Sequence, residues 1–253
     1  MAVPAQAAKD ASLREARAVL KSGQRILAFT GAGVSTPSGI PDFRSPGGVW
    51  SRFQPVTIQE FMVSDLGRLR YWEMRRLMWP GFVRARPNVV HAALARLEEE
   101  GRLLAVVTQN IDGLHQMAGS RKVVELHGTN RRVECMSCHR QDDMAPVQQQ
   151  LKEGEVPRCV GCGGWLKAAT ISFGQALKPE VLREAFALAA SCDVLLALGS
   201  SLVVHPAAAL PEAAVSAGAK LVLVNRDATP LDHLAAVLIH GPLEEAVPSI
   251  LPG

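Results

Sequence analysis

The sequence predicts an α/β fold in which a Rossmann-like parallel sheet is covered by helices on both faces. Two observations support this fold class. Four short apolar runs have the composition of buried parallel strands, and a helical pattern precedes each of them. Helices and strands that alternate along a chain are typical of a parallel sheet, because each crossover needs a covering helix. The expected strands are residues 26–30, 104–108, 194–198 and 221–224.

The helical patterns rest on apolar residues spaced three or four apart. In residues 12–21, Leu13, Ala16 and Leu20 would share one face, and Gly23 would end the helix. The other expected helices are residues 88–100, 179–190 and 206–217.

Two segments interrupt this alternation. Residues 43–87 are rich in Arg, Trp and Met and contain no clear strand, so we expect an inserted helical lobe. Residues 130–170 hold four cysteines, and we expect a small insert built around a metal. The two inserts would form a second, smaller domain beside a sheet domain, which is then made of residues 1–42, 88–129 and 171–253.

The composition excludes several classes of protein. The chain has 253 residues, 48% of them hydrophobic and 20% charged, which is the ordinary globular mix and unlike a coiled coil or a disordered chain. A net charge of +3 is too small to predict a nucleic-acid partner or a membrane surface. No apolar run reaches the roughly 18 residues of a membrane span, and the first residues do not resemble a secretory signal. We therefore expect a cytoplasmic protein.

The strongest local motif is a pair of Cys-x-x-Cys sequences. Cys135 and Cys138 are separated by 20 residues from Cys159 and Cys162, which is the spacing of a structural zinc site. Four thiolates leave the metal no open position, so it would stabilise the insert and do no chemistry. The alternative is four buried thiols without a metal. Cys192 is left over and is expected to be an inert core residue.

The segments that follow the expected strands indicate a ligand site, because ligands bind beyond the carboxyl ends of parallel strands. All of these segments are small or polar. Together they predict one polar cleft for a large, hydroxyl-rich ligand that carries phosphate. The segments are residues 31–36, 109–112, 199–201 and 225–227.

The first of these segments resembles a phosphate-binding loop. Gly31 and Gly33 lack Cβ atoms, so their N–H groups could approach a diphosphate. The motif is incomplete because Thr36 stands in place of the third glycine, and a tight turn is the alternative. Asn225, at the end of a later strand, could bind ribose hydroxyls.

Other polar residues at strand ends suit particular parts of such a ligand. Arg44, near the glycine loop, could bind phosphate, or it could form a solvated surface pair with Asp42. Asn110 and Asp112 point the same way in extended backbone, which suits a carboxamide such as that of nicotinamide. The alternative for Asp112 is helix capping.

Two histidines lie close to these segments. His127 follows a short apolar run, and its ordinary pKa near ~6.5 suits a general base at neutral pH. A single histidine is more often structural, and this is what we expect of His115.

The inserted lobe contains a basic, aromatic helix. It could be a solvated face with tryptophans packed inward, or the wall of a pocket that offers a cation to an acidic group. Its residues are Arg68, Arg70, Trp72, Arg75, Arg76 and Trp79.

Taken together and in this order, the motifs resemble the sirtuins, which are NAD-dependent protein-lysine deacylases, over nearly the whole chain. The resemblance implies NAD as cofactor, one structural zinc and an acylated-lysine protein or peptide as substrate. The matching parts are residues 31–35, 38–44, 108–115, 125–128 and 199–202, the four-cysteine insert and Asn225.

The resemblance also implies roles for single residues. The cofactor's phosphates and nicotinamide ribose would be held by Gly31, Ala32, Thr36, Phe43, Arg44 and Gln109. The nicotinamide pocket would be formed by Asp42, Asn110, Ile111 and Asp112. The adenosine half would be held by Gly199, Ser200, Ser201, Asn225 and the neighbouring Arg226.

In this family the acyl-lysine oxygen attacks C1′ of the nicotinamide ribose and nicotinamide leaves. His127 would then act as the general base that helps to move the acyl group to ADP-ribose, with Asn110 and Asp112 as further catalytic residues.

The substrate side departs from the common pattern of the family. Residues 167–175 stand where many relatives have Arg-Pro and two valines before Phe-Gly-Glu, so the peptide preference is open. In the family this segment pairs with the substrate backbone, which makes Phe173 and Gly174 expected contacts. Trp72 replaces the Tyr of the Tyr-x-x-Arg found in relatives that remove succinyl or malonyl groups, and Arg75 keeps the Arg. We expect deacetylation by default, with succinyl and long-chain acyl groups open.

Two other functions would use part of the same features. An NAD-dependent protein ADP-ribosyltransferase on this fold needs the same cleft but no acylated lysine. A non-catalytic zinc-ribbon module would explain the cysteines, but it would not explain the polar strand ends outside the insert.

Overall fold

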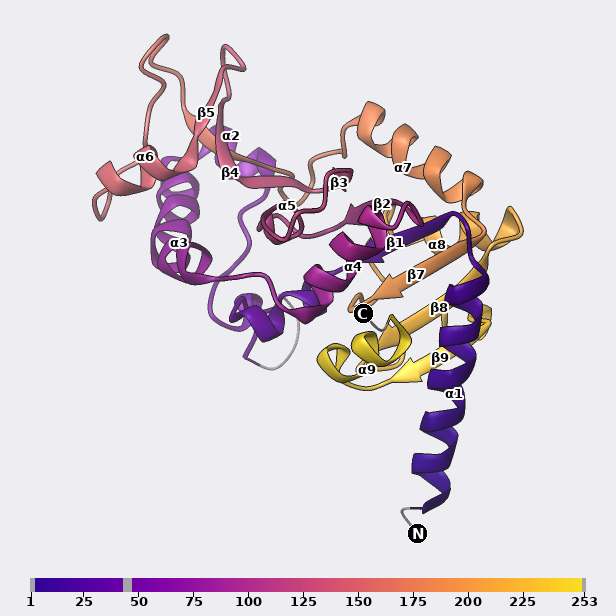
Figure 1. Ribbon diagram of the computed structural model, residues 1–253. Helices are drawn as coiled ribbons and strands as arrows, with labels where there is room; N and C mark the ends of the chain where they lie inside the picture. Colours follow the sequence, from indigo (N-terminus) through magenta and orange to yellow (C-terminus); the bar gives the residue numbers. More distant parts are fainter. Residues whose placement is uncertain (1–2, 43–46, 252–253) are drawn as a thin grey trace.

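The protein is built around a six-stranded parallel sheet (Figure 1). The computed structural model describes residues 3–42 and 47–251. The strands follow the order β3-β2-β1-β7-β8-β9, and all their pairings are parallel. The parallel fold class is confirmed, and the four expected strands are found to within one residue at each end. The strands are β1 (Ile26–Thr30), β2 (Leu103–Thr108), β3 (Val123–Glu125), β7 (Val194–Leu198), β8 (Lys220–Asn225) and β9 (Val237–His240).

Helices cover both faces of this sheet, as expected. Along β1, Ile26 and Ala28 point into one core, whereas Leu27 and Phe29 point into the other. Helices α1, α4 and α9 cover the first face, and α7 and α8 cover the second (Figure 1). The helices are α1 (Val3–Ser22), α4 (Val89–Glu99), α7 (Pro179–Ser191), α8 (Ala209–Ser216) and α9 (Leu243–Ile250).

The outer strand β9 was not predicted. It has only four residues, and a short 3-10 turn at Asp232–Leu234 precedes it where the other strands have a helix. Both signals used to recognise strands are therefore weak here. The helix α1 begins nine residues before its predicted start, because the alanine-rich segment ahead of it continues the helix.

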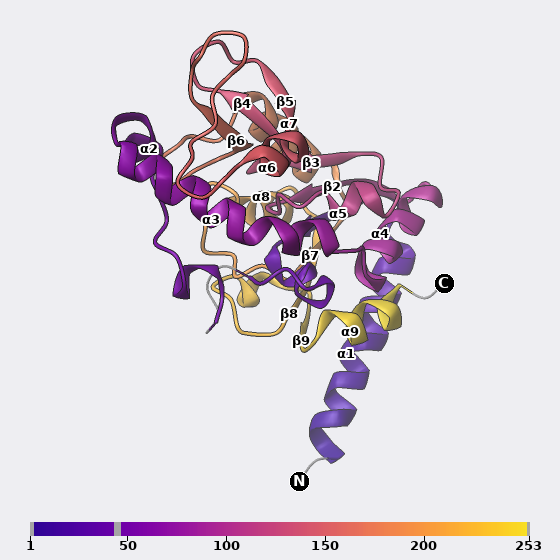
Figure 2. The same cartoon turned by 90° about the vertical axis from the view of Figure 1, so that its left-hand side faces the viewer.

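The two inserted segments lie together beside the sheet (Figures 1 and 2). Their strands form a small antiparallel sheet of order β5-β4-β6, and their buried side chains form a third core that includes Phe61, Trp72 and two of the cysteines. The helical insert and the insert that holds the four cysteines thus share one core. The elements are α2 (Ile58–Val63), α3 (Asp65–Arg84), β4 (Gly128–Cys135), β5 (Gln141–Asp143), α6 (Met144–Gln150) and β6 (Leu166–Thr170).

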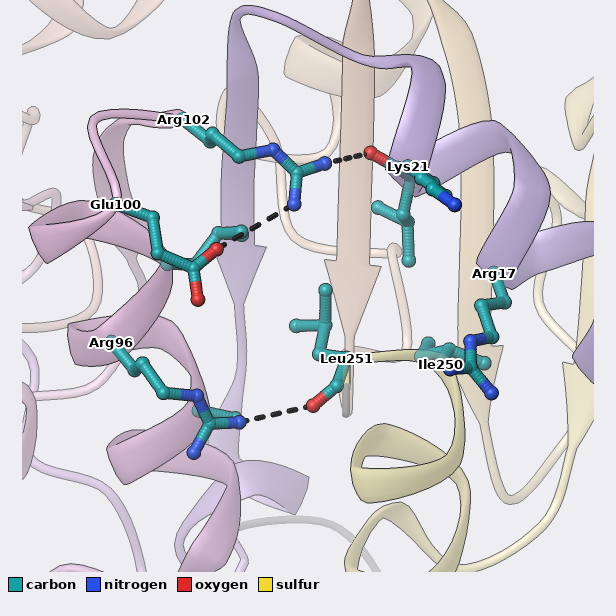
Figure 3. Close-up of a pocket in the computed structure, with 10 residues that line it drawn as sticks. Arg17, Lys21, Arg96, Glu100, Arg102, Ile250 and Leu251 are labelled. Atoms are coloured by element: carbon teal, nitrogen blue, oxygen red, sulfur yellow. Dashed lines mark hydrogen bonds and ion pairs between the residues drawn. The ribbon is translucent and has the colours of Figure 1, made fainter. Parts of the chain in front are cut away.

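Three helices end at a common pocket on the sheet face that they cover. This pocket of about 220 Å³ lies between α1, the end of α4 and the end of α9 (Figure 3). Arg102 donates a hydrogen bond to the carbonyl of Leu20 and pairs with Glu100 at 3.6 Å. Arg96 donates to the carbonyl of Leu251 at 3.1 Å. The arginines therefore satisfy carbonyls that helix C-termini leave without partners. Within the described ranges, no helix is both long and apolar enough to cross a bilayer.

We predict that Arg102→Met lowers the free energy of unfolding by about 1–2 kcal/mol, because the carbonyl at the end of α1 loses a charged donor. Urea denaturation measures this change. Arg17→Met is the matched control, since Arg17 lies on the same pocket and is exposed; its effect should stay within about 0.5 kcal/mol. Equal effects of the two changes would contradict the prediction.

Candidate functional site

A cavity of about 510 Å³ lies beyond the carboxyl ends of the parallel strands. All four segments that follow the predicted strands contribute to its wall, and α3 and residues 170–175 contribute to it as well. The structure thus brings together residues that are far apart in the sequence. The strand-end residues on the wall are Gly31, Ala32, Gly33, Thr36, Gln109, Asn110, Ile111, Gly199, Ser200, Ser201, Asn225, Arg226 and Asp227.

The loops after β1 and β7 touch each other at the mouth of this cavity. A Cβ atom on Gly31 would lie 2.7 Å from the carbonyl oxygen of Gly199, and one on Gly33 would lie 2.9 Å from the same oxygen. The N–H of Gly31 donates to Leu198, and that of Gly33 donates to Gly199. The expectation that these two amides face a diphosphate is therefore wrong. The glycines are needed because two backbones approach closely.

Asn110 and Asp112 meet at one hydroxyl group. The amide of Asn110 donates to the carbonyl of Gly31 and to Oγ of Ser35, both at 3.1 Å. Ser35 in turn donates to the carboxylate of Asp112 at 2.7 Å. Asp112 also accepts from the N–H of Leu114, so the helix-capping alternative is present. Burial raises the pKa of Asp112, and these hydrogen bonds oppose the rise.

Only one of these two side chains is on the cavity wall. Asn110 lines the cavity, whereas Asp112 is not among its lining residues. In this structure Asp112 contacts the wall of the cavity through the hydroxyl of Ser35. The signal that could have shown this is Gly113, whose positive φ turns the chain directly after Asp112.

His127 is oriented by the backbone of a neighbouring strand end. Its Nδ1 lies 3.0 Å from the carbonyl oxygen of Gln109. A carbonyl can only accept, so Nδ1 carries the proton and Nε2 keeps its lone pair. The side chain of Gln109 donates to Oγ of Ser200 at 2.7 Å, which ties the loops after β2 and β7 together. His127 lies on the cavity wall, and this tautomer suits a base.

The remaining predicted cofactor residues are found around the same cavity. Asp42 and Thr36 line it, and Thr36 donates to the carbonyl of Gly33. The amide nitrogen of Asn225 donates to the carbonyl of Asp227 at 2.7 Å. Arg226 also lines the cavity and pairs with Asp227 at 3.2 Å. Phe43 and Arg44 lie outside the described residues.

Helix α3 forms an apolar wall of the cavity, and Trp72, which was expected to contact the substrate, is not part of this wall. Trp72 does not line the cavity: it is fully buried, and its indole donates to the carbonyl of Leu166. The residues that face the cavity follow the helical period of three or four, which was the available signal. They are Tyr71, Met74, Arg75, Met78 and Phe82.

Arg75 is the member of the basic helix that reaches the cavity. It donates to Oδ1 of Asn130 and to Oγ1 of Thr170 at 2.8 Å, and its guanidinium lies over the ring of Tyr71. The buried Lys167 lies near the same ring. Burial and the charge of Arg75 lower the pKa of Lys167 to about 7. Arg75 therefore brings a cationic group to this end of the cavity, as the pocket-wall interpretation requires.

The edge of the small sheet leads into the cavity. Strand β6 pairs with β4 along one side and occupies an outer position in the order β5-β4-β6. Phe173, which follows β6, is 43% exposed and packs edge-on against Trp50. A Cβ on Gly174 would lie 2.6 Å from Gln59. Phe173 and Gly174 both line the cavity.

One part of the cavity wall was missed altogether. The chain from Gly241 to Glu244, between β9 and α9, lines the cavity. No site residue was expected after Asp227, because β9 was not recognised and no strand end was expected there.

The four paired cysteines converge at one point of the small lobe. Their sulfur atoms all lie within 4.8 Å of one another, with 3.5 Å between Cys135 and Cys162 and 3.9 Å between Cys138 and Cys159. A tetrahedral zinc with Zn–S bonds near 2.3 Å places its sulfurs about 3.8 Å apart, so this set fits zinc. The N–H groups of Cys138 and Ser137 lower the pKa of Cys135.

The fold and the cavity define a Rossmann-like, dinucleotide-binding class of protein with a metal-binding lobe. Residues 31–206 match the Sir2 family. An NAD-dependent protein deacetylase of Thermodesulfovibrio yellowstonii is 43% identical over 234 residues, which are 92% of this chain and 91% of that protein. The chain belongs to the Sir2 family, as the resemblance to the sirtuins implied.

Further relatives agree with this assignment. NAD-dependent protein deacylase 2 of Archaeoglobus fulgidus is 40% identical over 240 residues, which are 94% of each chain. A solved structure described as Sir2 with a p53 peptide and NAD+ is 38% identical and has a TM-score of 0.85; the match covers 93% of this chain and 95% of that one.

We predict about one zinc per chain, bound by the four clustered thiolates. Cys135→Ala should lose the metal and unfold the small lobe, because the cysteines are part of that lobe's core. Elemental analysis and limited proteolysis measure the two effects. Cys192→Ala is the control: this thiol is buried against the large sheet, so the zinc should remain. A folded Cys135→Ala protein without metal would contradict a structural role.

Proposed function

We propose that the protein is an NAD-dependent protein-lysine deacylase, with acetyl-lysine as its default substrate. Its products would be nicotinamide, free lysine and O-acyl-ADP-ribose. The observation that carries the proposal is one cavity shared by an oriented histidine and the polar strand ends on one side and an apolar helix wall on the other. The names of the relatives from Thermodesulfovibrio yellowstonii and Archaeoglobus fulgidus support the same activity.

The donor set at the strand ends suits NAD. Hydroxyl and amide groups on the wall match a ligand with two riboses and a carboxamide. When bound, NAD supplies a ribose carbon that becomes electrophilic as its bond to nicotinamide breaks. Ala32, Thr36 and Gln109 would hold the ribose and phosphate region together with Phe43 and Arg44. Ser200, Ser201, Asn225 and Arg226, with Gly199, would hold the adenosine half.

His127 would act as the general base. The carbonyl of Gln109 fixes Nδ1–H, so Nε2 is the nitrogen that can take a proton from a ribose hydroxyl. Asn110 would contact the nicotinamide end with Asp42 and Ile111, all three being on the wall. Asp112 would act as a positioning residue, because its carboxylate holds the Ser35 hydroxyl that Asn110 also contacts.

The small lobe would hold the acylated peptide. The outer position of β6 suits an added peptide strand that runs past Phe173 and Gly174. Met74, Met78 and Phe82 give the acyl group an apolar wall, which favours acetyl and other neutral chains. One observation favours acidic acyl groups instead: Arg75 lines the cavity, and its Nε is buried without a partner.

We also propose the domain division expected from the sequence, with residues 1–42, 88–129 and 171–253 binding NAD and the two inserts closing over them. A cytoplasmic location is proposed as well. Free cysteines clustered for a metal suit a reducing compartment.

We predict that His127→Ala lowers kcat for deacylation by about 100-fold or more, because the general base is lost. Mass spectrometry of an acetyl-lysine peptide incubated with NAD would follow free lysine and O-acetyl-ADP-ribose. The variant should still bind NAD in calorimetry. His233→Ala is a control, because that residue is not on the cavity wall.

The same experiment separates the alternative functions. ADP-ribose attached to protein, with every acyl group intact, would indicate an ADP-ribosyltransferase. Unchanged turnover in His127→Ala would refute the assigned base.

We further predict that acetyl-lysine and propionyl-lysine peptides react with higher kcat/KM than succinyl-lysine peptides. The cavity wall that α3 forms beside Arg75 is apolar, and the guanidinium of Arg75 already has two oxygen partners. Steady-state kinetics on matched peptides measures this ratio. If succinyl-lysine is the better substrate and Arg75→Met abolishes only that preference, the acidic-acyl alternative is correct.

A further inference from the structure

A chain of buried polar groups runs beneath the cavity, between α4 and the loop after β2. It starts at Asn88, whose amide donates to the carbonyl of Val34 and to Ser38, both at 2.8 Å, in the loop after β1. The backbone N–H of Asn88 donates to Nδ1 of His91, which completes the capping box of α4. The loop after β1 is therefore connected through Asn88 to the ring of His91.

The ring of His91 packs on the ring of His115. Their centroids are 4.8 Å apart, and the two side chains are 0% and 1% exposed. Burial lowers the pKa of His91 to about 4, and burial together with the charge of His91 lowers the pKa of His115 to about 3. Both imidazoles are neutral at pH 7, so each has one N–H and one lone pair.

From His115 the chain continues to the loop that carries Asn110. Nε2 of His115 lies 3.0 Å from Oγ1 of Thr30, and Thr30 donates to Oγ1 of Thr108 at 2.8 Å. The backbone N–H of Asn110 donates to the same Thr108 oxygen at 3.0 Å. Because Thr30 uses its proton on Thr108, Nε2 of His115 must donate to Thr30.

These partners determine both tautomers. His91 accepts at Nδ1 and therefore carries its proton on Nε2, while His115 carries its proton on Nε2 and leaves Nδ1 as an acceptor. Among the described residues, Nε2 of His91 and Nδ1 of His115 are the buried ring nitrogens without a partner. No hydrogen bond joins these two nitrogens, so the two residues contact each other through ring packing.

We propose that His115 is a positioning residue for the NAD reaction. It holds the loop that carries Asn110 through Thr30 and Thr108, and its ring contact with His91 connects this loop to the loop after β1. The proposal rests on the proposed function. None of these four side chains lines the cavity, so the action is indirect: the backbone of Asn110 is held from below, and its side chain remains on the wall.

Three substitutions of His115 test the proposal. In His115→Gln the amide reaches the place of Nε2 and can still donate to Thr30, whereas His115→Asn places its amide at Nδ1, and His115→Leu has no polar group. We expect kcat for nicotinamide release to fall about tenfold in the Asn and Leu variants, the equivalent of one buried hydrogen bond. His115→Gln should retain turnover near that of the unmodified protein. KM for the acetylated peptide should not change, since the peptide contacts lie beyond β6.

A double-mutant cycle tests whether His115 acts through its hydrogen bond to Thr30. In a Thr30→Val background, His115→Asn should cause no further loss of kcat, because the contact is already absent. Ser120→Ala, which removes another buried hydroxyl just after helix α5 (Leu114–Met117), is the control and should leave kcat unchanged. Equal kcat in all three His115 variants, or additive losses in the cycle, would overturn the proposal.

Hydrogen exchange of the Asn110 amide gives a readout that does not depend on turnover. Exchange should accelerate in the Asn and Leu variants and in Thr108→Val, but not in His115→Gln. If the unmodified protein released no nicotinamide, the proposed function would fail, whereas unaltered Asn110 exchange in every variant would refute the network.

Discussion

The close approach of the loops after β1 and β7 is the constraint on which the site depends. Gly31 leaves no room for a Cβ beside the carbonyl of Gly199, and the loop after β2 is bonded to both of them. Asn110 donates to the carbonyl of Gly31, and Gln109 donates to Ser200. Since β1 has β2 and β7 as its neighbours, this is the switch point of the sheet, where parallel strands leave a crevice. Three strand ends therefore behave as one unit, and His127 takes its orientation from that unit.

The protein separates the chemistry from the recognition of the substrate. The parallel sheet is buried on both faces, so the polar residues at its ends are carried by a rigid support. The small lobe has a three-stranded sheet and a limited core, and such a lobe gains stability from a metal held by four thiolates. Its contribution to the cavity is the apolar side of α3 and the edge beside β6. With the proposed function, a change in the lobe would alter which acyl chain fits without moving the residues proposed to hold NAD.

Sequence patterns worked where one residue type implies one environment. All-apolar runs indicated the central strands because these strands are buried on both faces, and the cysteine spacing indicated a metal site. The patterns failed where a residue had to choose between two faces. Trp72 and Tyr71 are neighbours on α3, and only the packing of α3 against β6 decides that Trp72 enters the core while Tyr71 faces the cavity. The glycine amides are a similar case, because their partners belong to β7 and the loop after it.

The amino-acid pattern was sufficient for the kind of fold, the positions of the strand ends, the four cysteines of the metal site and the family to which the chain belongs. These follow from local composition and spacing, which are set along the chain. The packing of distant segments sets which of the polar residues reach the cavity, which ring nitrogen of His127 is protonated and which groups the two buried histidines contact. Each of these depends on atoms contributed by distant segments, and no local pattern records which partner a side chain will meet.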